Sequence, residues 1–220
     1  KSHKNLNEFQ MKNRNIPYGM HEIDDNDISA VVDVLRSGTI TQGQKVVEFG
    51  KALALHTGAK YAIPVANGTC ALHLCLAALG IKEGDEIITT TMTFCATSNA
   101  ALYLGATVKF VDIDPLTLNI DPKKIEAQIT DRTKVIMPVD FRGHPADLVA
   151  INQIAKKHGL FVVEDGSHSI GSTYTENGKS FSCGDGQHAD FCTFSFHPVK
   201  HITTGEGGAV LTNNYELFAR

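Results

Sequence analysis

Short apolar runs alternate with segments of helical periodicity from residue 61 onward. The first five runs are YAIPVA (61–66), EIITT (86–90), TVKFVDI (107–113), KVIMPV (134–139) and LFVVED (160–165). Near-continuous apolar runs of this length are typical of strands that are covered on both faces of a sheet. Two further runs, ADFCTFSF (189–196) and GAVLTN (208–213), follow without a helix between them. We therefore predict that these runs form one sheet.

Helical segments separate the first five runs. The first has one apolar face with i, i+3, i+4, i+7 spacing, formed by Leu72, Cys75, Leu76 and Leu79. Others are predicted near residues 95–104, from Asp121-Pro122 onward, and over 145–158. Strands that alternate with helices need right-handed crossovers, which place parallel strands between two layers of helices. The predicted fold class is α/β, in three layers (α/β/α) around a mostly parallel sheet.

Two helices are predicted before the first strand. Asp24 is placed to cap the first, which ends at Gly38, and its apolar positions are Ile28, Val31, Val32 and Leu35. The second covers residues 45–56, with Gly58 just beyond its end. Residues 1–15 are polar, and we expect them to form an extension outside a domain of residues 16–220.

Composition restricts the class of protein. The chain has 220 residues, 20% of them charged, and a formal net charge of -4, without a basic block that would attract nucleic acid or a membrane surface. Its apolar runs fall short of the ~20 residues of a membrane-spanning helix, and the first residues lack the apolar centre of a signal peptide. We therefore expect a cytoplasmic protein with no nucleic-acid or membrane partner.

The cysteines and histidines do not predict a metal site or disulfides. No CxxC pair occurs among the five cysteines, so small buried thiols are predicted at Cys70, Cys75, Cys95, Cys183 and Cys192. Pro198 lies between His197 and His201 and opposes the helix that would place both rings on one face. No HExxH motif is present.

Candidate chemistry lies in the loops after the strands, where ligands of parallel α/β sheets bind. After residues 61–66, the residues Asn67-Gly68-Thr69-Cys70 enter a helix, whose free N–H groups and dipole suit a phosphate. An ordinary strand-to-helix turn fits the same residues. After residues 86–90 comes Phe94, which is either a core residue or a stacking partner for a flat ring.

Two ionisable residues follow the next strands. Asp165 ends the run 160–165, where a carboxylate is costly unless it is paired or functional, although it also suits an N-cap. Ser167 is an alternative cap, which leaves Asp165 without an evident structural role. Lys200 has apolar neighbours and no acidic residue within five positions. Desolvation lowers the pKa of an amine and favours attack on carbonyls, whereas an exposed lysine would have no such role.

These features match one cofactor. A pyridoxal phosphate site needs a phosphate seat at a helix start, an aromatic against the ring, a carboxylate at the pyridine nitrogen and a Schiff-base lysine. A dinucleotide site is not predicted, because the glycine patterns GDGQHA (184–189) and GEGGAV (205–210) run into strands and do not open a helix. The glycines of the second pattern are expected to permit close backbone approach.

Longer motifs identify a resemblance. NGTCAL, TFCATSNA, FVDIDPLTLNID, VEDGSHSIGSTY and FSFHPVKHITTGEGGAV resemble the DegT/DnrJ/EryC1/StrS family of sugar-nucleotide aminotransferases, from about Ile16 to the last residue. The nearest resemblance is to members that act in pseudaminic acid biosynthesis. It implies the large domain of a fold-type-I pyridoxal-phosphate-dependent transferase, without the small C-terminal domain that follows in the family. It also implies that the full-length protein is a homodimer.

The resemblance also implies roles for single residues. Lys200 would form the Schiff base and move a proton between the sugar C4 and the cofactor, while Asp165 would pair with the pyridine nitrogen. His168 would lie near the ring 3-hydroxyl and Phe94 would stack on the ring. The phosphate would be held, or its seat lined, by Gly68, Thr69, Cys70 and Ser195. The nucleotide-sugar would meet Tyr18, Gly38, Thr39, Ile40 and Thr41.

The implied reaction moves the amino group of L-glutamate, which becomes 2-oxoglutarate, to C4 of a UDP-4-keto-6-deoxy-N-acetylhexosamine. Two alternatives remain open: a non-catalytic regulatory or assembly protein on the same fold, and a pyridoxal-phosphate-dependent sugar dehydratase or lyase. Dehydrating members carry histidine in place of the lysine, so Lys200 favours transamination. Asp140 stands where many relatives have histidine, and its role stays open, as does that of Glu206.

Overall fold

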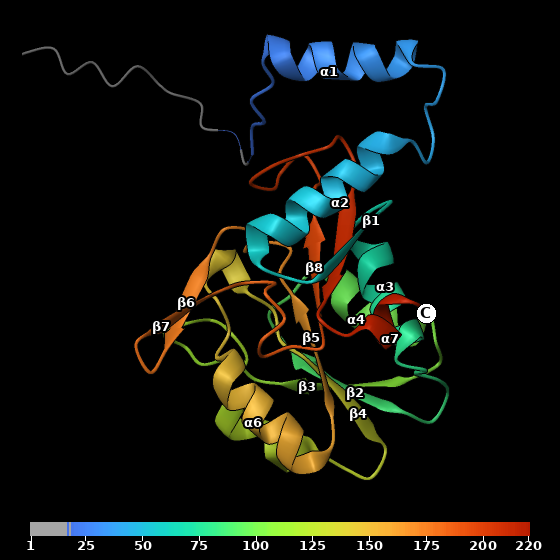
Figure 1. Cartoon of the computed structure of the whole chain (residues 1–220). Helices are drawn as coiled ribbons and strands as arrows, with labels where there is room; N and C mark the ends of the chain where they lie inside the picture. Colours follow the sequence, from blue (N-terminus) through green and yellow to red (C-terminus); the bar gives the residue numbers. More distant parts are fainter. Residues whose placement is uncertain (1–16, 18) are drawn as a thin grey trace, which may run out of the picture.

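A seven-stranded sheet forms the centre of the fold (Figure 1). The computed structural model describes residues 17 and 19–220, so the predicted extension 1–15 and Tyr18 lie outside the described residues. In spatial order the strands are β1 (Tyr61–Val65), β9 (Gly208–Thr212), β8 (Phe191–Ser195), β5 (Phe161–Asp165), β4 (Thr133–Met137), β2 (Glu86–Thr90) and β3 (Thr107–Val111).

Most of the sheet is parallel, as predicted. Parallel pairing joins β8 to β5, β5 to β4, β4 to β2 and β2 to β3. The exception is β9, which runs antiparallel between β1 and β8. It has this direction because no crossover helix separates it from β8, so the chain returns alongside the strand it has just left.

Two helical layers cover the sheet. The longer helices are α1 (Asp25–Arg36), α2 (Gln44–Thr57), α3 (Gly68–Ala78), α4 (Cys95–Leu102) and α6 (Leu148–His158). Successive strand residues face opposite sides, so Ile87 packs in the core cluster that contains α3 and α4, whereas Ile88 packs in the cluster that contains α6. Residues of β8 and β9 alternate in the same way, with Cys192 and Leu211 in a cluster with α2. The predicted three layers are confirmed.

Some boundaries differ from the predictions. The helix predicted over 145–158 begins at Leu148, because the Asp147 side chain accepts a hydrogen bond from the Ala150 amide and caps it there. The helix predicted at Asp121-Pro122 is a single turn, α5 (Pro122–Ile125), followed by the 3-10 turn η1 (Glu126–Gln128). A second 3-10 turn, η2 (Phe141–Gly143), follows β4.

Three short elements were not predicted. They are the hairpin of β6 (Thr173–Glu176) with β7 (Lys179–Ser182), and the helix α7 (Tyr215–Phe218). The hairpin turn is Asn177-Gly178, with φ of 50° and 79°. Asn-Gly is the preferred pair for two-residue hairpin turns, so this hairpin had a readable sequence signature.

The first helix forms as predicted, but its apolar face does not enter the core. Asp24 caps α1 by accepting hydrogen bonds from the amides of Asn26 and Asp27. No residue of α1 is buried, and Figure 1 shows it beyond α2, away from the sheet. Its exposed apolar side chains are Ile28, Val31 and Leu35.

All five cysteines are free. The prediction of buried thiols is confirmed for Cys75, Cys183 and Cys192, but it is wrong for Cys95, which is exposed at the start of α4. Cys70 is half-buried. Within residues 17 and 19–220, every helix is too short or too polar to span a lipid bilayer.

Candidate active site

The start of α3 forms a seat for an anion. Asn67 caps the helix, and its side chain accepts a hydrogen bond from the Cys70 amide at 2.8 Å, while its carbonyl accepts one from the Ala71 amide. The amides of Gly68 and Thr69 have no acceptor within the part of the chain that the structure describes. Two free N–H groups at the positive end of a helix favour a phosphate oxygen.

The other side of this seat is Ser195, the last residue of β8. A Cβ atom added at Gly68 would lie 2.9 Å from the Ser195 Cβ and 3.4 Å from its Oγ. The seat therefore needs glycine at position 68, and it places the Ser195 hydroxyl beside the free amides. Gly208 brings β9 equally close, since a Cβ there would lie 2.7 Å from the Gly68 nitrogen. The expected close backbone approach at the glycine-rich segment is confirmed at Gly208.

Asp165 is buried at the end of β5, with both carboxylate oxygens occupied. Its Oδ2 accepts a hydrogen bond from Thr97 Oγ1 at 2.7 Å, and its Oδ1 accepts from the Ser167 hydroxyl at 2.7 Å and from the Ser167 amide at 3.2 Å. The prediction that Asp165 lacks a structural role is wrong, because it holds the turn that follows β5. The same bonds fix the direction in which its carboxylate points.

Lys200 lies in the loop after β8 and is half-buried. Burial lowers the pKa of its amine, and the nearby charge of Asp165 opposes that effect in part. The reading as a freely solvated surface lysine is therefore wrong. The loop is held to the end of the strand region because Thr203 Oγ1 and the Thr204 amide both donate to the Phe196 carbonyl.

His168 belongs to the turn after Asp165 and is partly buried. Burial lowers the pKa of its imidazole, and the charges of Lys200 and His201 lower it further, while Asp165 raises it. Its Nδ1 atom is buried without a hydrogen-bond partner in the described chain. A neutral imidazole with a free ring nitrogen therefore lies close to Lys200.

Phe94 is the N-cap residue of α4 and is 71% exposed. A core residue of this size would be almost fully buried, so the core alternative is wrong. Its ring is free to contact a flat ligand.

The residues expected to meet a nucleotide-sugar do not join this group. Gly38, Thr39, Ile40 and Thr41 are exposed in the loop between α1 and α2, and Thr39 and Ile40 line a cleft between these helices. Tyr18 lies outside the described residues. Its neighbour Gly19 approaches the Lys200 loop, because a Cβ there would lie 3.2 Å from the Val199 Cα.

Thr97 was not predicted as a site residue. It donates to Asp165 from a position 68 residues away, and only the fold brings the two together. Asn67, in contrast, was readable as the cap of α3, since asparagine is a preferred N-cap.

A family of known proteins matches most of the chain. The model of the DegT/DnrJ/EryC1/StrS aminotransferase family matches residues 21–220. The chain belongs to this family. The predicted resemblance is thereby confirmed, and the match includes every candidate site residue except Tyr18.

Two curated proteins are similar to the chain over most of its length. The UDP-4-amino-4,6-dideoxy-N-acetyl-beta-L-altrosamine transaminase of Campylobacter jejuni is 44% identical over 208 residues, which are 93% of this chain and 53% of that protein. The GDP-perosamine synthase of Caulobacter vibrioides is 45% identical over 199 residues, 90% of this chain and 52% of that protein. The chain spans about half the length of the curated relatives it matches.

Among solved structures, the PLP form of the putative sugar aminotransferase Spr1654 from Streptococcus pneumoniae has the same fold. It superposes with a TM-score of 0.85 and 35% identity, covering 92% of this chain and 54% of that chain. This similarity confirms the fold class predicted for the chain, an α/β fold with a mostly parallel sheet.

Proposed function

We propose that the protein is a pyridoxal-phosphate-dependent aminotransferase that moves the amino group of L-glutamate to C4 of a UDP-4-keto-6-deoxy-N-acetylhexosamine. The observation that carries the proposal is the environment of Lys200. Burial lowers the pKa of its amine, and the amine lies near enough to Asp165 for the carboxylate charge to act on that pKa. A partly buried lysine after β8 and a buried carboxylate at the end of the neighbouring β5 fit the arrangement that this cofactor requires.

The described residues fit pyridoxal 5′-phosphate. When bound, this cofactor supplies an aldehyde that condenses with amines and a ring that withdraws electrons from the reacting carbon. The free amides of Gly68 and Thr69 and the Ser195 hydroxyl would hold its phosphate, in a seat that a Cβ at position 68 would fill. Cys70 would line this seat without donating, because its amide is already bonded to Asn67.

Other residues would hold the ring. Phe94 offers an exposed aromatic face at the start of α4. The Asp165 carboxylate would keep a proton on the pyridine nitrogen, and the hydrogen bonds from Thr97 and Ser167 would hold that carboxylate in place. The neutral imidazole of His168 would lie beside the ring, where its free Nδ1 can take part in a hydrogen bond with a ring substituent.

Lys200 would move the proton. Its lowered pKa enriches the neutral amine, which is both the nucleophilic form and the basic form. As a base it would take a proton from the carbon that bears the amino group of glutamate. In the second half of the reaction it would return a proton to C4 of the sugar.

The substrate choice rests on sequence motifs. TITQG (39–43), FCATSNA (94–100) and FSFHPVKHITTGEGG (194–208) most resemble transaminases of pseudaminic acid biosynthesis. The Campylobacter relative supports a UDP-sugar, whereas the Caulobacter relative, named for a GDP-sugar product, is equally similar. We therefore propose that the product is used in the biosynthesis of pseudaminic acid or a related surface glycan.

A homodimer of the full-length protein is part of the proposal, with residues 16–220 as the large domain that holds the cofactor. Exposed apolar side chains support it, because partner subunits commonly cover such surfaces. They are Ile28, Val31 and Leu35 on α1, Leu102 on α4, and the adjacent Tyr103. Light scattering on the full-length protein tests this directly, and a monomer at all concentrations would contradict it.

The test of the proposed activity is product analysis. Full-length protein, L-glutamate and a panel of UDP- and GDP-4-ketosugars should give the 4-amino sugar and 2-oxoglutarate by mass spectrometry, and a Lys200→Ala protein should give neither. Eliminated water without amine transfer would instead indicate a dehydratase. A well-folded protein that transfers no amino group to any ketosugar would overturn the proposal and favour a non-catalytic role.

A further inference from the structure

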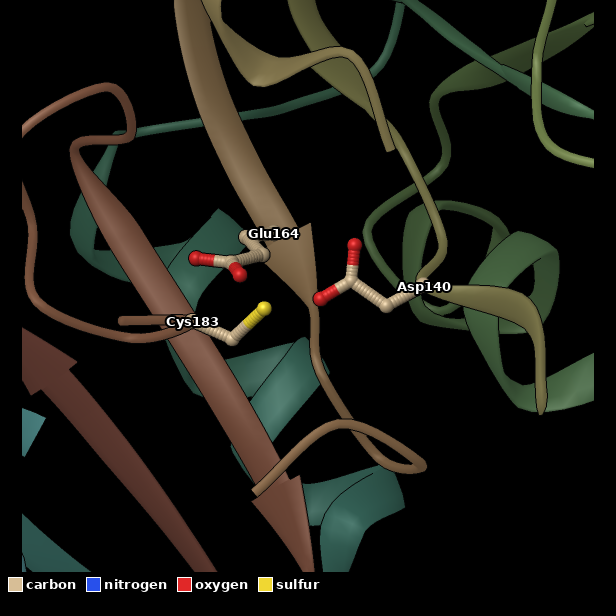
Figure 2. Close-up of side chains that lie close together, drawn as sticks. All are labelled: Asp140, Glu164 and Cys183. Atoms are coloured by element: carbon tan, nitrogen blue, oxygen red, sulfur yellow. The ribbon is translucent and has the colours of Figure 1, made fainter. Parts of the chain in front are cut away.

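Two buried carboxyl groups lie directly behind Asp165. Asp140 follows β4 and Glu164 precedes Asp165 in β5, and both side chains are inaccessible to solvent. Figure 2 shows their side chains close together, with the sulfur of Cys183, which follows β7, turned toward the space between them. One ligand atom from each of the three residues lies within 4.8 Å of the others. None of these residues takes part in the proposed reaction.

The two carboxyl groups differ in how many of their oxygen atoms accept hydrogen bonds. Asp140 accepts at both oxygens, from the Ala146 amide at 2.8 Å and from the Ser169 hydroxyl at 2.6 Å. Glu164 accepts only at Oε2, from the Gly184 amide at 3.2 Å, while its buried Oε1 has no donor. If Asp140 is ionised, each of its oxygens still has a hydrogen-bond donor. If Glu164 is ionised, its buried Oε1 carries charge without a donor, which costs several kcal/mol.

No positive charge offsets the pair. The titratable groups that face it are Cys183, Cys192 and Tyr174, and burial raises the pKa of each, so all three are neutral at physiological pH. Within residues 17 and 19–220, no salt bridge involves Asp140 or Glu164. Burial, together with the charge of Asp140, raises the pKa of Glu164 well above its usual range. Two negative charges in this site would repel each other strongly.

We propose that Asp140 and Glu164 share one proton, which Glu164 Oε1 donates to Asp140, and that this pair positions the turn carrying Asp165 and His168. The second half rests on the proposed function. A bound metal ion is the competing explanation. The geometry favours the proton, because the cluster offers a cation three ligands where structural zinc sites have four.

The positioning role follows from the contacts of Asp140. Its amide donates to the Asp165 carbonyl at 3.1 Å, and its carboxylate accepts from the Ser169 hydroxyl. The Ser169 amide in turn donates to the Gly166 carbonyl at 2.9 Å. Asp140 therefore holds both ends of the turn that carries Asp165 and His168. A second carboxylate charge beside Asp140 would push it away from these donors, and the shared proton removes that charge.

The pH dependence of unfolding tests the shared proton. In the unfolded chain Glu164 releases its proton near pH 4.3, whereas the folded state retains it. The wild type should therefore lose stability as pH rises above about 4.3, by up to about tenfold in the unfolding constant per pH unit, until the raised folded pKa is reached. Glu164→Gln keeps the donor to Asp140 without a titrating proton, so this slope should disappear. The exposed Glu216→Gln should keep it.

Asp140→Asn serves as a second variant if Glu164→Gln does not fold. It removes the charge beside Glu164 but not the burial, so the loss of stability should end at a lower pH than in the wild type. A wild-type slope in Glu164→Gln, or a loss of stability in Asp140→Asn that extends to the same pH as in the wild type, would overturn the proposal. Elemental analysis of full-length protein purified without chelator should find no stoichiometric metal. One equivalent of metal that Glu164→Gln loses would overturn it as well.

Cofactor binding tests the positioning role. We expect Asp140→Ala to weaken pyridoxal 5′-phosphate binding at least tenfold and to shift the pH midpoint of the visible absorption band, and Asp140→Asn to restore both. Wild-type binding and midpoint in Asp140→Ala would overturn the positioning half. A wild type that does not bind the cofactor would refute the proposed function and this half together, while the unfolding slope would still decide the shared proton.

Discussion

Thr97 Oγ1 donates a hydrogen bond of 2.7 Å to Asp165 Oδ2, although Thr97 lies in α4 and Asp165 ends β5. Both side chains are buried, and Ser167 holds the other carboxylate oxygen. The direction of the Asp165 carboxylate is therefore set before a ligand arrives. Such preorganisation lets a binding group act without a further entropy cost.

Replacing Thr97 with valine should separate positioning from general stability. Valine keeps the shape but removes the donor, so we expect a loss of about 1–2 kcal/mol in the free energy of unfolding and cofactor binding about tenfold weaker. Thr89→Val is the matched control, since Thr89 donates to the Met137 carbonyl at 2.8 Å within the sheet. It should lose similar stability but keep cofactor affinity. Equal cofactor affinities in the two variants would contradict the role of Thr97.

Gly68→Ala should damage the anion seat. The new methyl group would lie 2.9 Å from the Ser195 Cβ, and relieving such overpacking typically costs about 1–3 kcal/mol. Adding Ser195→Gly removes the colliding atom, so the double variant should recover stability but not phosphate affinity, because the hydroxyl is lost. Thermal unfolding and cofactor titration measure the two effects. A single Gly68→Ala variant with wild-type stability and affinity would refute the close contact.

Thiol labelling should follow exposure. A small alkylating reagent should modify Cys95 quickly and Cys70 more slowly, because Cys95 is exposed and Cys70 half-buried. Cys75, Cys183 and Cys192 should react only after unfolding, since burial both shields them and raises the pKa of each thiol. Mass spectrometry of digested samples identifies the sites. Fast labelling of any buried cysteine in the native protein would contradict the described packing.

Lys200 should carry a stability cost that depends on pH. Burial lowers the pKa of its amine, so between the folded and unfolded pKa values the unfolded chain binds more protons, and stability rises with pH there. Cofactor-free Lys200→Met should therefore have a modestly higher Tm than the wild type near pH 7, and this advantage should shrink as pH rises through the lowered pKa. An advantage that stays constant up to pH 11 would mean that Lys200 is not desolvated.

The sequence predicted most of the fold because strands and helices in this chain have strong local patterns. Ile87 and Ile88 lie on opposite faces of a fully buried strand, and the continuous apolar run around them indicated that burial. The hairpin at Asn177-Gly178 was missed although its turn residues are characteristic. The exposure of α1 was beyond prediction, because an amphipathic pattern does not specify what covers the apolar face.

The candidate site was predictable where one segment carries the chemistry. Lys200 and the start of α3 each have a local signature, a lysine after a buried strand and a capped helix opening with glycine. The bond from Thr97 to Asp165 and the pairing of Asp140 with Glu164 join distant segments, and no local pattern encodes them. Tertiary contacts alone decide these partners.

The central claim is that Lys200 is the residue to which the cofactor attaches. Full-length protein treated with pyridoxal 5′-phosphate and then borohydride, which reduces the bond between a lysine amine and an aldehyde, should lose its visible absorption band. Digestion and tandem mass spectrometry should find the pyridoxyl group on Lys200, and a Lys200→Ala protein should carry none. A pyridoxyl group on another lysine, or a visible band that persists in Lys200→Ala, would contradict the account.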